Sequence, residues 1–186
     1  VRRAQTIDEA IAIVRERPVA STWGIAVSSA TEHRAVVIET TSKNVRIVEP
    51  DQDDTDHLSC ANRYRHEANH AGEIDASAAW AAHSDGRQNR LHGLVAHARG
   101  RGGMTVTDLE NALDDRVDPS APDIERGAGA IVAQPCTVKS IVADPENRAI
   151  YVSVGPAPTS RGPYQKVDWS WDGETAGWTA DPVELT

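Results

Sequence analysis

The chain has 186 residues and a formal net charge of −9, from 28 acidic and 19 basic side chains. This length suits one domain with a buried core, so we expect a single domain over residues 1–186. A strongly acidic chain attracts neither nucleic acid nor anionic lipid, which excludes both as expected main partners. No apolar run reaches the roughly 20 residues of a membrane helix, and no signal peptide is visible, so a cytoplasmic protein is expected.

The basic side chains are nearly all arginine, and phenylalanine is absent. Only three are lysines: Lys43, Lys139 and Lys166. This composition is typical of a high-salt cytoplasm or of a GC-rich genome, and the sequence leaves both open. We favour a halophilic source, for which refolding and activity would need molar salt. Because the first residue is Val1 and not Met, we expect a processed, trimmed or partial chain.

The first quarter of the chain predicts one helix followed by strands. Apolar spacing predicts a helix over residues 6–17, with Thr6 as its cap and Pro18 ending it. Short polar stretches separate the next apolar runs, which is typical of hairpin turns. The predicted strands of this antiparallel meander are residues 21–28, 35–41 and 44–49.

The remainder predicts a short strand, two helices and a return to strands. A strand over residues 57–64 follows an acidic loop. Helical spacing then marks residues 84–99 and 105–115, where Thr105 or Thr107 caps the second helix. The later elements are strands 136–144 and 148–155 and an extended surface tail over 160–186. This order predicts the α+β class.

Four segments, in this order, are similar to a known family: "TIDEAIAIV" with the strands up to "AVVIETTSKNVRIVEP", "LSCANRY", "SDGRQNRLHGLV" with "TVTDLENALDD", and "TVKSIVADPENRAIYVSVGPAP". They resemble the C-terminal part of the penicillin acyltransferase-like (acyl-CoA:6-aminopenicillanic acid acyltransferase-like) cysteine Ntn hydrolases. The resemblance covers roughly residues 4–160. It implies part of an αββα sandwich with mainly antiparallel strands.

The resemblance also implies a chemistry. In that family a cysteine freed by self-cleavage is the nucleophile, and its α-amine is the base that cleaves or transfers acyl groups at linear amide bonds. Asn62 matches the asparagine that stabilises the oxyanion, and Arg126 is the nearest match for an arginine that holds a substrate carboxylate. Neither Cys60 nor Cys136 has a Gly-Cys cleavage context, so the nucleophile is expected outside this chain.

The resemblance implies a small-molecule acyl-amide substrate, with no cofactor and no metal. Without its upstream segment the fold would leave an exposed sheet edge. The expected partners are therefore that missing segment or a second copy of the chain. A non-catalytic remnant or interaction domain is the alternative within the same fold.

A second alternative is a zinc-dependent hydrolase built on the "HEANH" motif. On a helix, His66 and His70 would face one way and bind zinc, with Glu67 as general base and with His57 and Cys60 nearby. The neighbouring residues are not an apolar helix face, so a solvated loop or helix face is the competing interpretation. The metal content of the protein separates the two.

The two cysteines, Cys60 and Cys136, are too few for a disulfide scaffold and are expected to be buried thiols. A nucleophilic pair of Cys60 with His57 or His66 is the alternative. On a strand, however, His57 and Cys60 would point to opposite faces, which favours the buried thiol.

Overall fold

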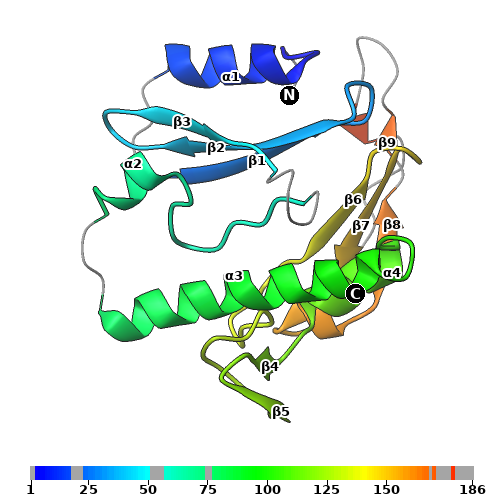
Figure 1. Cartoon of the computed structure of the whole chain (residues 1–186). Helices are drawn as coiled ribbons and strands as arrows, with labels where there is room; N and C mark the ends of the chain where they lie inside the picture. Colours follow the sequence, from blue (N-terminus) through cyan, green and yellow to red (C-terminus); the bar gives the residue numbers. More distant parts are fainter. Residues whose placement is uncertain are drawn as a thin grey trace. The chain divides into compact units, whose positions relative to one another are not determined.

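The computed structural model of the chain is mixed α+β, as predicted (Figure 1). It describes residues 3–17, 23–50, 57–73, 77–167, 169–170 and 177–178. The chain divides into two compact units, Val1–His92 and Gly93–Thr186, and each is described by itself. None of the helices in these described ranges combines the length and the apolar character needed to cross a membrane.

The first element, helix α1 (Ile7–Glu16), begins at a complete capping box. The Thr6 hydroxyl accepts a hydrogen bond from the Glu9 backbone N–H at 3.1 Å, and the Glu9 carboxylate accepts one from the Thr6 N–H at 3.3 Å. The C-cap Arg17 is extended, the conformation that a residue before proline prefers. The predicted helix is therefore confirmed.

Three antiparallel strands follow α1, and the predicted meander is confirmed. They are β1 (Trp23–Ser29), β2 (Arg34–Thr40) and β3 (Val45–Val48). β2 lies in the centre, and Ile38 is paired with Ile25 on one side and Ile47 on the other. In the described part of the chain β1 is thus an edge strand, and Trp23 at its start is 59 % exposed.

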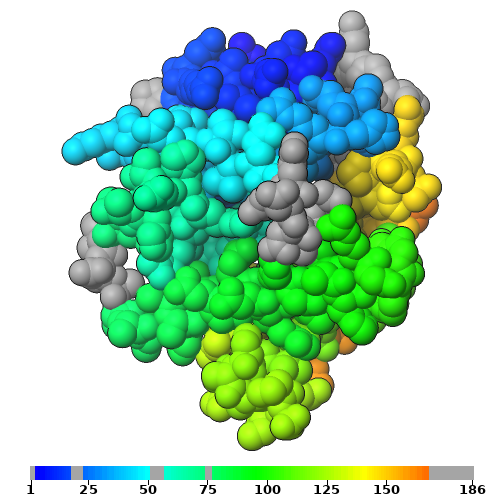
Figure 2. Space-filling model, in the orientation of Figure 1, coloured from blue at the N-terminus to red at the C-terminus, as the bar shows by residue number. Residues whose placement is uncertain are grey.

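One face of this sheet packs against α1 and forms the core of the first unit. Ile7 and Ile11 from the helix meet Val36 and Ile38 from the central strand, and all four are buried. In Figure 2 the blue atoms of α1 lie directly over the light-blue and cyan atoms of the sheet. Because successive side chains of a strand alternate, Val37 and Glu39 point to the opposite face, where they are also buried.

Residues 57–64 do not form the predicted strand. They are irregular, with a bend at Asn62 and Arg63, and they take part in no ladder within the described residues before they lead into the one-turn helix α2 (Glu67–His70). The strand expected from the alternation in the sequence was therefore wrong. The hydrogen-bonding partners, however, are side chains rather than a neighbouring strand.

Helices were predicted in both later regions and are confirmed, but the first of them has a different start. Helix α3 (Ala78–Arg99) starts earlier than predicted, after Ser77, whose hydroxyl accepts from the Trp80 N–H at 3.4 Å. Helix α4 (Val106–Leu113) begins at a second capping box between Thr105 and Asp108.

The second unit contains short antiparallel strands. β6 (Ile141–Asp144), β7 (Ala149–Ser153) and β8 (Tyr164–Val167) form one sheet in that order, and the 3-10 helix η1 (Thr159–Arg161) connects the last two. The other strand pairs are β4 (Val117–Asp118) with β5 (Ala121–Glu125), and β9 (Trp169–Ser170) with β10 (Gly177–Trp178).

Two of these strands differ from the sequence-based expectation. β6 begins only at Ile141, because the Ser153 hydroxyl accepts from the Ser140 N–H at 2.8 Å and takes that amide out of a regular ladder. β8 lies in the segment expected to be a surface strand or extension, most of which beyond residue 170 lies outside the described residues. It is held in the sheet because Val167 pairs with Ile150 and is buried.

The capping box of α1 gives a stability prediction. The substitution Thr6→Ala removes the acceptor for the Glu9 N–H and should lower the free energy of unfolding by about 1 kcal/mol, measured by urea denaturation. Thr107→Ala, an exposed position inside the first turn of α4, is the matched control. Equal effects of the two substitutions would show that the cap contributes nothing specific.

Candidate functional site

The candidate site is built on the irregular segment 57–66, which runs antiparallel to α3 within the first unit (Figure 1). Its start contacts a later turn of the helix than its end does. The contacts, in order along the segment, are the His57 ring with the His92 ring at 5.0 Å, the Ala61 N–H with Gln88 Oε1 at 3.2 Å, and the Asn62 N–H with Ser84 Oγ at 2.9 Å. The segment therefore follows the surface of the helix and is held there by helix side chains.

The residues of α3 that hold the segment share one helix face. Ser84, Gln88 and His92 are spaced four apart, so they stack above one another. Gln88 also donates through Nε2 to the Ser59 carbonyl at 3.0 Å and to the Ser59 hydroxyl. These side-chain hydrogen bonds take the place of the backbone hydrogen bonds that a neighbouring strand would make.

On its other side the segment is held by Glu39, a carboxylate only 2 % exposed. Glu39 accepts hydrogen bonds from the Arg65 N–H at 2.5 Å, the His66 N–H at 3.2 Å and Asn69 Nδ2 at 3.4 Å. A buried carboxylate is costly unless donors surround it. These three donors fix the chain where the irregular segment turns into α2.

Between these two anchors, Tyr64 joins the segment to both the sheet and the chain after α2. Its N–H donates to Glu73 Oε1 at 2.5 Å, and its hydroxyl donates to the Thr40 carbonyl at 2.7 Å. Arg63 forms ion pairs with Glu73 at 3.0 Å and Asp85 at 2.8 Å. The segment is therefore fixed at almost every residue.

Asn62 is the exposed side chain that this arrangement presents. Its Oδ1 accepts from Arg87 Nη2 at 2.7 Å. Because arginine has no acceptor, the amide oxygen must face it and the NH2 group must point elsewhere. No described residue accepts a hydrogen bond from that NH2 group. Asn62 thus has a side-chain N–H donor that no described residue engages, and its role in a site stays a prediction.

Cys60 lies beside this asparagine but is turned toward the sheet. A Cβ placed on Gly24 would be 3.8 Å from both Cys60 Sγ and Val37 Cγ1, so the thiol packs over the strands. Burial raises the pKa of the Cys60 thiol, and the negative charge of Glu39 raises it further, against an opposing effect of Arg65. The sulfur is therefore held as a thiol, which is a poor nucleophile.

The second cysteine departs from the expectation of two buried thiols. Cys136 is exposed, and Cys60 is only half-buried. Both are free. The general burial preference of cysteine was wrong for Cys136 because the chain around it forms a loop before β6.

The "HEANH" motif is not arranged as a two-histidine helix face. His66 is the extended N-cap of α2, and its Nδ1 accepts from the Ala68 N–H at 3.2 Å. His70 instead contacts Glu73, at 3.2 Å, and Arg63. Across the ranges that the structure describes, no three His, Cys, Asp or Glu side chains gather as metal ligands would.

Arg126 lies just after β5 in the second unit, whereas Asn62 belongs to the first unit. Its Nε pairs with Asp118 Oδ2 at 3.2 Å, while Asp118 Oδ1 accepts from the Ser120 N–H at 2.9 Å. The guanidinium thus closes the β4–β5 hairpin. Its role toward a substrate carboxylate stays a prediction.

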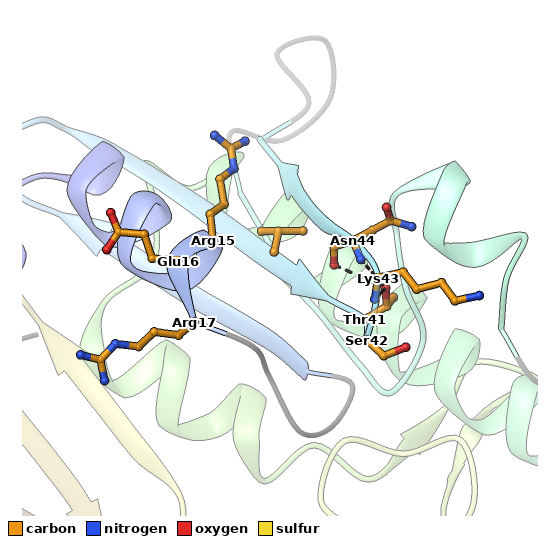
Figure 3. A pocket seen from close by; sticks show the side chains of 8 residues that line it. Arg15, Glu16, Arg17, Thr41, Ser42, Lys43 and Asn44 are labelled. Atoms are coloured by element: carbon orange, nitrogen blue, oxygen red, sulfur yellow. Dashed lines mark hydrogen bonds between the residues drawn. The ribbon is translucent and has the colours of Figure 1, made fainter.

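A cavity of about 220 Å³ lies between the end of α1 and the turn after β2. In Figure 3 the charged ends of Arg15, Arg17 and Lys43 point away from one another. The Thr41 hydroxyl accepts from the Asn44 N–H at 2.9 Å and so belongs to the turn. These side chains do not converge on a common point, and the cavity offers no built site.

Sequence reasoning pointed to Asn62, whose functional role stays a prediction, and missed the residues that contact it. The importance of Glu39 could have been recognised from the sequence, because it is the one charged residue in the apolar run "AVVIET". Ser84 and Gln88 had a weaker signal, a four-residue polar spacing within a helix. Nothing in the sequence assigned Arg87 to Asn62.

A search of protein-family models, a search of curated proteins and a search of solved structures each found no match.

The network around Glu39 predicts a loss of stability when its charge is removed. Glu39→Gln keeps one acceptor oxygen but sets an NH2 group against at least one of the three N–H donors, so the free energy of unfolding should fall by about 1–3 kcal/mol in urea denaturation. Glu125→Gln, at the exposed end of β5, is the control and should have little effect. Wild-type stability of Glu39→Gln would contradict the assigned network.

The environment of Cys60 predicts slow alkylation. Iodoacetamide should modify exposed Cys136 first, as followed by mass spectrometry. In a Cys136→Ser variant the alkylation rate of Cys60 should still be low at neutral pH and rise above the ordinary thiol pKa, because a raised pKa leaves little thiolate below it. Rapid alkylation of Cys60 at neutral pH would show an activated sulfur instead.

Proposed function

We propose that the chain is the C-terminal portion of a cysteine-nucleophile Ntn hydrolase of the penicillin acyltransferase-like kind, which cleaves or transfers acyl groups at linear amide bonds. The observation that supports it is the Asn62 side chain, whose oxygen is bound by Arg87 and whose NH2 group is unengaged by the described residues. The proposed fold is the αββα sandwich with mainly antiparallel strands, of which the sheet β1–β2–β3 with α1 on its face would be one half.

The proposed chemistry needs such a donor. A sulfur nucleophile adds to the carbonyl carbon of an amide, and the π electron pair of the C=O bond moves onto the oxygen. The resulting oxyanion is stabilised by N–H groups placed in advance, a contribution of roughly 10²- to 10³-fold in kcat for one donor. Collapse of the intermediate expels the amine, which takes its proton from the protonated base. Asn62 would be one of the oxyanion donors.

The proposal assigns the nucleophile and its α-amine base to sequence outside these 186 residues. Cys60 is unsuited to the role, because its thiol packs on the sheet and its pKa is raised. Arg126 would contribute charge near the substrate in this proposal, although Asp118 now occupies its guanidinium. The substrate would be a small-molecule acyl amide.

The zinc-dependent alternative gains no support from the geometry. A ring nitrogen of His66 is engaged in capping α2, and His70 contacts Glu73 and Arg63. The non-catalytic alternative predicts the same fold without turnover. Activity and metal content together therefore separate the three.

The proposal predicts loss of turnover when the Asn62 amide is removed. In a chain extended by the upstream segment that the proposal requires, Asn62→Ala should lower kcat by roughly 10²- to 10³-fold on a panel of acyl-amide substrates. Asn89→Ala, an exposed asparagine on α3, is the matched control and should keep wild-type kcat. Chelator should change neither protein.

Three results would contradict the proposal. Stoichiometric zinc with chelator-sensitive hydrolysis would favour the "HEANH" alternative. No turnover of any amide in either dilute or molar salt would favour a non-catalytic domain. Full activity of Asn62→Ala would remove the assigned donor.

A further inference from the structure

We propose that Arg87 is a positioning residue for the oxyanion donor, an inference that rests on the proposed function. Arg87 contacts Asn62 and lies behind it with respect to an external oxygen, because it binds the amide oxygen while the NH2 group points elsewhere. It would therefore act on the substrate only through Asn62. Neither the family resemblance nor the motif analysis pointed to this arginine.

Two residues from a single turn of α3 hold the backbone N–H and the side-chain oxygen of Asn62. Ser84 accepts the Asn62 backbone N–H at 2.9 Å, and three residues later Arg87 donates to the side-chain oxygen at 2.7 Å. The Arg87 guanidinium is itself tied to its own helix, because Nε donates to the His83 carbonyl at 3.3 Å. An amide anchored this way has one orientation in place of many.

The arginine also settles which end of the amide faces outward. An asparagine side chain can rotate by half a turn and exchange its oxygen and its NH2 group. In the exchanged state the NH2 hydrogens of Asn62 would oppose the N–H groups of Arg87, which can only donate. The positive charge thus selects the state in which the N–H groups point toward the incoming oxygen.

The same charge strengthens the donor. A charge-assisted hydrogen bond to the amide oxygen polarises the amide, so that its N–H groups become better donors. The effect grows as negative charge develops on the substrate oxygen, and it therefore favours the transition state over the bound substrate. Loss of Arg87 should accordingly lower kcat and leave KM nearly unchanged.

The first test measures acyl-amide turnover in a chain that includes the upstream segment required by the proposed function. Arg87→Met should lower kcat roughly 10- to 100-fold, the range expected for losing one charged hydrogen bond. Arg87→Lys should recover part of that loss. Millimolar guanidinium chloride should partly rescue Arg87→Ala, which a purely structural defect would not show. Arg99→Met, an exposed arginine at the end of the same helix, removes the same charge and should retain wild-type kcat.

The second test uses the 186-residue chain and needs no activity. In ¹⁵N-labelled protein, the NMR resonances of the Asn62 side-chain NH2 group should shift in Arg87→Met and stay in place in Arg99→Met. Thermal melting of each variant checks that the fold is retained. Unchanged Asn62 resonances in Arg87→Met would overturn the contact on which the inference rests.

The outcomes distinguish this inference from the proposed function. No amide turnover by the wild-type protein would overturn both. Turnover that depends on Asn62 but has the same kcat in Arg87→Met would overturn the inference alone. A loss in Arg87→Met confined to KM, or one that guanidinium and lysine fail to restore at all, would likewise overturn it.

Discussion

The first unit depends on one constraint: the backbone N–H groups of the irregular segment 57–66 have no neighbouring strand among the described residues. Backbone donors removed from water must still find acceptors. Here the acceptors are side chains: Ser84 and Gln88 from α3, Glu73 after α2, and the buried carboxylate of Glu39. The sheet and the helix therefore meet through this segment, and its conformation is set by four specific residues.

This construction explains how an exposed asparagine can be rigid. A polar loop in water would leave Asn62 free to sample many rotamers, at a cost in any chemistry that needs fixed geometry. Side chains of a regular helix instead hold both its backbone and its amide oxygen. Groups placed by helices and strands are positioned more accurately than groups on loops alone, which suits an oxyanion donor.

Sequence patterns predicted the elements whose cause is local. The Thr6 and Thr105 capping boxes mark α1 and α4, and alternating apolar residues mark β1 and β2. Patterns failed where the cause is tertiary. Alternation in 57–64 predicted a strand, but this segment is instead an irregular stretch held by side chains of a helix. Val167 reveals its strand only once Ile150 is beside it. Asn62 was proposed from its motif, whereas Arg87 lies 25 residues away and contacts it only in the folded chain.

The most direct test of this account is amide hydrogen exchange of the 186-residue chain, followed by NMR. The account predicts that the N–H groups of Ala61, Asn62, Tyr64 and Arg65 are protected, although they belong to no strand, and that Ser84→Ala selectively exposes Asn62. Exchange of these amides at the rate of an unstructured peptide would contradict it. The segment would then be a loose loop, and Asn62 could not be a positioned donor.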